Sequence, residues 1–87
     1  MPWVYILRCA DGTLYVGHTE DLAARTALHN AGHGARYTAA RRPVRMVYSE
    51  EHDSPQSAVK RERQLKGWTV RKKEALIAGD VAALKRL

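Results

Sequence analysis

Two short runs of β-forming residues on either side of a tight turn constrain the fold of this chain most strongly. Residues 3–9 and 13–18 are rich in Val, Ile, Leu, Tyr and Thr, and the turn-forming pair Asp11-Gly12 lies between them. This composition and spacing predict a β-hairpin. Because side chains alternate between the two faces of a strand, the pairing register decides which of them share a face.

The length of the hairpin loop sets that register. A two-residue loop would pair Arg8 with Tyr15, whereas a three-residue loop with Gly12 in the left-handed region pairs Leu7 with Tyr15. We favour the three-residue loop because it separates an apolar face from a tyrosine-bearing face. The apolar face then holds Val4, Ile6, Leu14 and Val16, and the other face holds Tyr5, Leu7, Cys9, Thr13 and Tyr15.

A helix, a loop and a strand are expected in the middle of the chain. Thr19 has a capping side chain and predicts the start of a helix that runs to about Asn30 and is ended by Gly32. Residues 32–42 combine glycines and arginines without hydrophobic periodicity, which indicates an ordered basic loop. Residues 44–51 alternate well enough to predict a third strand.

Helix-capping residues mark further helices toward the C-terminus. The expected helices start after Asp53 or Ser54 and run to Lys66, start at Thr69 and end at Gly79, and start at Asp80 and end at Leu84. The predicted fold is α/β of the α+β type: a small three-stranded antiparallel sheet flanked by helices, in the order ββαβαα, with an optional short terminal helix. We expect one domain over residues 1–80, with residues 81–87 as a short helical extension of the same domain.

The charge of the chain points to an anionic partner. Fifteen Lys and Arg against nine Asp and Glu give a net charge of +6, which favours nucleic acid over anionic lipid or acidic proteins. The apolar runs fall far short of the ~20 residues of a membrane-spanning helix, so no membrane role is expected. A single Cys9 and the absence of a signal peptide before the first strand predict a cytoplasmic protein. We expect a monomer or a weak dimer.

Five residues form a candidate catalytic set, which comprises Tyr5, Tyr15, Arg25, His29 and Glu62. Arg25 and His29 lie four residues apart, so they share one face of a helix and point toward the same neighbour. Two phenols, a guanidinium, an imidazole and a carboxylate suit metal-assisted cleavage of a phosphodiester. The alternative is ordinary structure, with the tyrosines in the core, the arginine solvated and the histidine at an edge.

Glu62 has two interpretations. Its helix places Ala58, Glu62 and Leu65 on one stripe, so a carboxylate lies among apolar positions and needs a partner. Alternatively, Glu62 is exposed and pairs with Lys66 one turn later or with a neighbouring arginine.

Basic and aromatic residues provide candidate contacts to a phosphate strand. These candidates are Arg36, Tyr37, Arg41 and Arg42 in the basic loop and Lys60, Arg63 and Lys66 in the following helix. Such contacts position a substrate and carry no sequence information.

The order and spacing of these residues resemble the GIY-YIG nuclease family, in particular its small standalone members and the catalytic modules of excision-repair nucleases and of intron-encoded endonucleases. The two signatures appear as Trp3-Val4-Tyr5 and Tyr15-Val16-Gly17, and the family's arginine, histidine and metal-binding glutamate fall on Arg25, His29 and Glu62. The resemblance covers nearly the whole chain.

The resemblance implies a metal-dependent DNA endonuclease of low or structure-dependent specificity, with DNA repair as an associated process. Glu62 would hold one Mg²⁺ or Mn²⁺, and Arg25 would bind charge that develops in the transition state. Tyr5 or Tyr15, with a pKa lowered by the cation and Arg25, would accept a proton from water, and His29 would hold or relay to a tyrosine hydroxyl.

Two departures from the family keep other functions open. No asparagine follows Asn30, although many members have one near the site, and His18 stands where some members have a lysine. His18 either tunes the nearby tyrosine or packs at the strand end, and we favour packing. The alternatives to an enzyme are a catalytically weak or inactive nucleic-acid-binding module and a protein-interaction subunit with a basic face.

Overall fold

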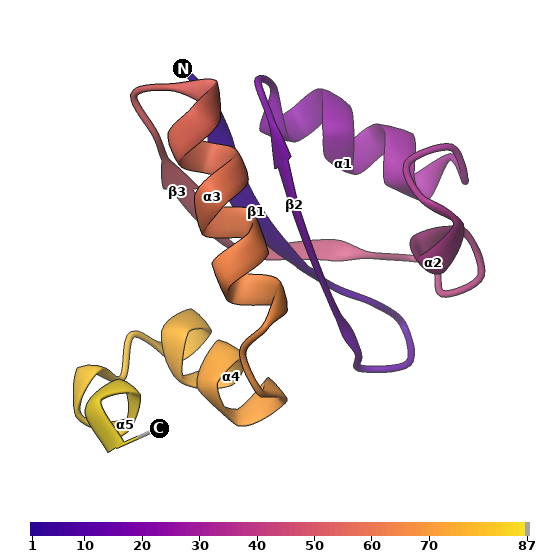
Figure 1. The fold of residues 1–87 in the computed structure, drawn as a ribbon. Coiled ribbons are helices and arrows are strands. Elements are labelled where there is room, and N and C mark those ends of the chain that lie inside the picture. Colours follow the sequence, from indigo (N-terminus) through magenta and orange to yellow (C-terminus); the bar gives the residue numbers. More distant parts are fainter. Residues whose placement is uncertain (87) are drawn as a thin grey trace.

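The structure is a computed structural model that describes residues 1–86. Three antiparallel strands form one sheet in the order β2-β1-β3, and helices pack on both of its faces (Figure 1). The strands are β1 (Trp3–Arg8), β2 (Leu14–Thr19) and β3 (Arg45–Glu51). The helices are α1 (Leu22–Asn30), α2 (Arg36–Ala39), α3 (Pro55–Lys66), α4 (Val70–Ala78) and α5 (Val81–Arg86). The predicted fold class is therefore confirmed.

The hairpin has the predicted three-residue loop. Leu7 pairs with Tyr15, and Gly12 takes a φ of 86°, in the left-handed region that favours glycine. This register separates two buried clusters on opposite faces of the sheet. One cluster contains Val4, Ile6, Val16, Ala58 and Leu65, and the other contains Tyr5, Leu7, Cys9 and Val44.

Each face has its own helical cover. Helix α3 lies across β1 and β2 on the Val4–Ile6 face because Ala58 and Leu65 are fully buried there. Helices α1 and α2 lie on the opposite, tyrosine-bearing side (Figure 1). Helix α4 is tied back to the sheet by Arg8, whose two terminal nitrogens donate to Glu74 at 2.6 and 2.8 Å. This two-point ion pair fixes the end of β1 against the C-terminal helices.

Two local predictions were wrong. The cap of α1 is Asp21, whose carboxylate accepts from the Ala24 amide at 3.0 Å, while Thr19 is the last residue of β2. The basic stretch after Gly32 is also not a plain loop, because it contains the single-turn helix α2. The predicted caps Ser54, at α3, and Thr69, at α4, do accept amide hydrogen bonds.

No helix within residues 1–86 is long and apolar enough to cross a membrane.

Candidate active site

A buried chain of hydrogen bonds crosses the tyrosine face of the sheet. The Tyr5 hydroxyl lies 2.9 Å from His29 Nε2, and His29 Nδ1 lies 2.7 Å from the Thr38 hydroxyl. Thr38 in turn donates to the Ala35 carbonyl at 3.1 Å. Tyr5, His29 and Thr38 are almost completely shielded from solvent. The chain therefore joins β1, α1 and α2 through side chains whose positions are fixed by packing.

Two glycines make room for this chain of hydrogen bonds. Gly17 lies opposite Tyr5 in the hairpin, and a Cβ at Gly17 would overlap the Tyr5 hydroxyl. A Cβ at Gly34 would likewise overlap the imidazole of His29. The Tyr5 ring can therefore pass over β2 toward its free edge, and the backbone before α2 lies directly against the His29 ring.

Tyr15 contacts the same histidine from β2. Its ring meets the His29 ring edge to face at a centroid distance of 5.1 Å and stacks on Tyr37 of α2 at 6.3 Å. The Arg41 guanidinium lies over the Tyr37 ring, 3.8 Å from its centroid. The two tyrosines predicted to share a face thus both contact His29.

Burial controls the electrostatics of this face. Burial raises the pKa of Tyr5 to about 12, with Tyr15 and Glu62 adding to the shift and the Arg25 charge opposing it. Arg25 lowers this pKa as predicted, but desolvation of the buried hydroxyl outweighs its charge in the net shift. Burial and the Arg25 charge lower the pKa of His29, so both His29 and Tyr5 are neutral at pH 7.

Glu62 approaches from the other face of the sheet. Its side chain is only 14% exposed, and it forms a hydrogen bond with His18 Nδ1 and an ion pair with Lys66 Nζ at 2.7 Å. Burial opposes ionisation, but the hydrogen bonds and charges of Lys66 and His18 outweigh it and lower the pKa of Glu62. The carboxylate is thus anionic at neutral pH. The favoured packing role of His18 was wrong, because its imidazole contacts this carboxylate and is 46% exposed.

Glu62 and the tyrosine-bearing face come near each other at the free edge of β2. Because β2 is an outer strand, side chains of α3 can reach around it, and Lys66 Nζ lies 6.0 Å from the Tyr15 ring centroid. Glu62 is close enough to raise the pKa of Tyr5. No hydrogen bond within residues 1–86 joins Glu62 to the tyrosines, Arg25 or His29. The carboxylate and the phenols therefore flank one strand edge without direct contact.

Comparisons with known proteins give the family of this chain. The model of the GIY-YIG catalytic domain matches residues 1–75. This chain belongs to the GIY-YIG family. UPF0213 proteins from the Mu3 and Mu50 strains of Staphylococcus aureus are 48% identical to it over 75 residues, which are 86% of this chain and 92% of each relative. The solution NMR structure of a UPF0213 protein from Bacillus halodurans is similar to it at 40% identity and a TM-score of 0.59, over 92% of this chain and 86% of that chain.

The basic residues predicted to contact a phosphate strand fall into two groups in this GIY-YIG domain. Arg41 donates to Asp11 and to the Tyr37 carbonyl, and Arg42 donates to the carbonyls of Ala39 and Asn30, so both hold the segment around α2 in place. The other candidates are exposed residues whose side chains form no ion pair within residues 1–86, apart from Lys66. These are Arg36, Lys60, Arg63 and Lys66.

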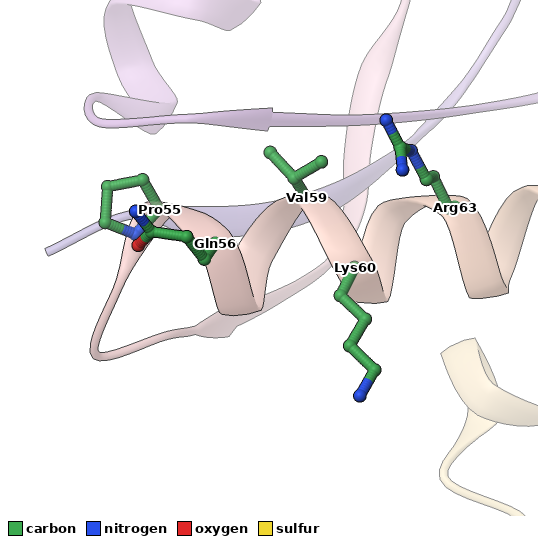
Figure 2. Close-up of a pocket in the computed structure, with 5 residues that line it drawn as sticks. All are labelled: Pro55, Gln56, Val59, Lys60 and Arg63. Carbon is green, nitrogen blue, oxygen red and sulfur yellow. The ribbon is translucent and has the colours of Figure 1, made fainter.

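An open groove runs along α3 near this second group. Pro55, Gln56, Val59, Lys60 and Arg63 line it. Figure 2 shows Val59 and Arg63 pointing to one side of the helix and Lys60 to the other. The groove combines an apolar wall with two cationic side chains, which favours an anionic partner.

Glu62 is the residue of the GIY-YIG site best suited to bind a hard cation. Its carboxylate is anionic, and Mg²⁺ often takes one or two protein carboxylates and keeps several waters. Within residues 1–86, no three His, Cys, Asp or Glu side chains come together in a metal-binding group. The residues fit a cation that shares its ligands between one carboxylate, water and substrate, and they do not fit a closed zinc site.

Sequence reasoning missed three contributors to the GIY-YIG site. Thr38, Gly17 and Gly34 contact or make room for the reactive side chains, yet none was predicted to do so. The glycines carried a usable signal, since Gly17 belongs to the second signature and Gly34 to a glycine pair before α2. Thr38 gave no such signal because its partner lies nine residues earlier, across a turn.

Proposed function

We propose that this protein is a divalent-metal-dependent endonuclease that cleaves phosphodiester bonds of DNA with low or structure-dependent specificity. The observation that carries the proposal is the juxtaposition at the β2 edge of the hydrogen-bonded Tyr5–His29 pair and the anionic Glu62. A nuclease needs a proton acceptor for water and stabilisation of charge on the phosphate, and these residues supply both kinds of group.

Each residue has a separate task in this proposal. Tyr5 and His29 form the pair through which the proton of the attacking water leaves, and Arg25 binds the charge that develops on the phosphate. Glu62 holds Mg²⁺ or Mn²⁺, which when bound supplies positive charge beside the phosphate and the leaving oxygen. Tyr15 positions the His29 ring through its edge-to-face contact.

The substrate path follows the exposed cations. Arg36 lies on the tyrosine side of the β2 edge, whereas Lys60 and Arg63 flank the groove along α3. A strand that passes the β2 edge would meet cations on both sides of the site. We expect these cations to contact the phosphate backbone, which positions a strand without reading its bases.

A cleavage assay with a matched carboxylate control tests the proposal. Labelled duplex, single-stranded and flap DNA and an RNA are incubated with Mg²⁺, Mn²⁺ or chelator, with the parent protein, Glu62→Gln and Glu74→Gln. Glu74 also pairs with a basic side chain, but on α4, so its loss controls for the removal of a charge. We expect products that require metal, that are lost with Glu62→Gln by about 10²-fold or more, and that persist with Glu74→Gln. Equal cleavage by the parent and Glu62→Gln would refute the assignment.

A second candidate is a binding module of the same fold with weak or no catalysis. It is favoured by the occupancy of both carboxylate oxygens of Glu62, one by His18 and the other by Lys66. Such a protein would bind DNA with a steep dependence on salt and would give no metal-dependent product in the same assay.

A further inference from the structure

We propose that Thr38 is a positioning residue that holds His29 in the tautomer protonated at Nδ1, so that His29 Nε2 accepts the Tyr5 proton. The role of this tautomer in catalysis rests on the proposed function, whereas the tautomer itself does not. It assigns a direction to each proton in the buried chain from Tyr5 through His29 and Thr38 to the Ala35 carbonyl.

Counting donors and acceptors selects this tautomer. A threonine hydroxyl has one proton, and Thr38 directs it to the Ala35 carbonyl, one turn earlier in the chain. The lone pairs of Thr38 Oγ1 are then left to accept from His29 Nδ1–H at 2.7 Å. With its proton on Nδ1, the neutral ring presents an unprotonated Nε2 to the Tyr5 hydroxyl, which donates to it. Every proton in the chain has an acceptor.

The other two protonation states leave a proton unplaced. If His29 carried its proton on Nε2, it would donate to the Tyr5 oxygen, and the Tyr5 proton would have no other acceptor among residues 1–86. If both ring nitrogens were protonated, the imidazolium would lie in a buried site near the Arg25 charge, which lowers the pKa of His29. A buried donor without an acceptor is destabilising, so both states are disfavoured.

The surroundings of the ring reinforce this orientation. The Gly34 backbone and the Tyr15 ring both lie against His29, which keeps the imidazole from turning over and exchanging its two nitrogens. Thr38 itself is fully buried in α2. In the reaction, His29 Nε2 takes the Tyr5 proton as Tyr5 takes one from the attacking water, and Thr38 keeps accepting from Nδ1–H while the ring is charged.

Ring nitrogen chemical shifts test the tautomer without any substrate. In isotope-labelled parent protein, long-range nitrogen–proton correlation spectra distinguish a protonated ring nitrogen from an unprotonated one. We expect His29 to show a protonated Nδ1 and an unprotonated Nε2. A protonated Nε2 in the parent would overturn the proposal directly, whether or not the protein cleaves DNA, so its failure is distinct from that of the proposed function.

Three threonine variants test the role of Thr38. Thr38→Val removes the acceptor at nearly constant volume, and we expect His29 to gain protonation at Nε2, whereas Thr38→Ser should keep the parent tautomer. Thr26→Val is the matched control, because Thr26 also donates to a helix carbonyl, that of Leu22, but forms no hydrogen bond with the His29 ring among residues 1–86. An unchanged tautomer in Thr38→Val would overturn the positioning role. If that variant does not fold, a tautomer change in Thr38→Ser would overturn it instead.

Kinetics give a second, separate readout. With DNA as substrate, Thr38→Val should lower kcat by about 10-fold or more with little change in KM, and Thr38→Ser should restore most of the loss. A rise in KM at unchanged kcat would assign Thr38 to substrate binding and overturn its role in holding His29.

Discussion

The two faces of the sheet hold their parts of the proposed site by different means. On the α1–α2 face, Tyr5, His29 and Thr38 are buried, neutral and joined in one hydrogen-bonded chain. At the opposite side of the β2 edge, Glu62 is charged and is held by His18 and Lys66, whose side chains are 46% and 51% exposed. Packing fixes the first part, whereas solvent-exposed charges hold the second. In the proposed mechanism, the proton-handling groups would therefore be preorganised, and a cation would replace His18 and Lys66 at the carboxylate.

The largest expected effect tests whether the two parts act on one phosphate. Arg25→Ala and Glu62→Gln should each reduce kcat/KM by about 10²-fold or more, because each removes a charge aimed at the transition state. The effects of mutating groups that act as a unit are strongly non-additive. The double variant should therefore be only slightly slower than the slower of the two single variants. Single-turnover cleavage of one labelled DNA substrate measures all three. A double variant slower by the product of the two factors would mean that the parts act independently.

The rigidity of the buried face can be tested by adding one methyl group. Gly34→Ala places a Cβ inside the van der Waals volume of the His29 imidazole, and such overpacking should lower the free energy of unfolding by about 1–3 kcal/mol. Gly67→Ala is the control, because Gly67 has a helical φ of −82° and its Cβ would meet only ordinary contacts. That change should stabilise by about 0.4–1 kcal/mol by restricting the unfolded chain. Urea unfolding measures both, and equal effects would show that the backbone at Gly34 gives way easily.

The same contrast explains how much the sequence could predict. The alternation of the hairpin fixed its register, and the caps Ser54 and Thr69 marked α3 and α4, because these signals act over a few residues. The catalytic candidates on the tyrosine face were predicted together for the same reason, since strand and helix periodicity put them on known faces.

What the sequence could not predict depends on contacts between distant segments. The hydrogen bond between His18 and Glu62 spans 44 residues and requires knowledge of where α3 crosses β2. The raised pKa of Tyr5 also depends on burial by α1 and α2, which no local pattern measures. The sequence therefore indicated which groups are candidates for the site, whereas the fold decided which of them are charged.

A pH titration separates the two faces by their protonation. The folded state lowers the pKa of His29 below its ordinary 6.5, so the unfolded chain binds that proton more readily. The stability gained from the neutral ring is present above pH 6.5 and is lost as pH falls below the lowered pKa of the folded state. The lowered pKa of Glu62 adds a further loss only below its ordinary 4.5.

Urea unfolding at several pH values measures this dependence. The slope between about pH 7 and pH 5 should be smaller for His29→Gln than for the parent, whereas His33→Gln, which removes an exposed histidine from the loop, should keep the parent slope. If the His29→Gln slope equals that of the parent, the buried face does not supply the acid sensitivity.

The smallest expected effect concerns the ion pair at the exposed edge. Lys66 and Glu62 lie one helical turn apart, and because Lys66 is 51% exposed we expect the pair to stabilise the helix by about 0.3–0.5 kcal/mol, as pairs at this spacing do. A double-mutant cycle with Lys66→Gln, Glu62→Gln and the double variant isolates that coupling in urea unfolding. A coupling of this size would show that Lys66 is easily displaced, as a carboxylate that must bind a cation requires. A coupling above about 1.5 kcal/mol would instead mean that Lys66 holds Glu62 rigidly. The carboxylate would then be as fixed as the buried Tyr5–His29–Thr38 chain, contrary to the contrast drawn above.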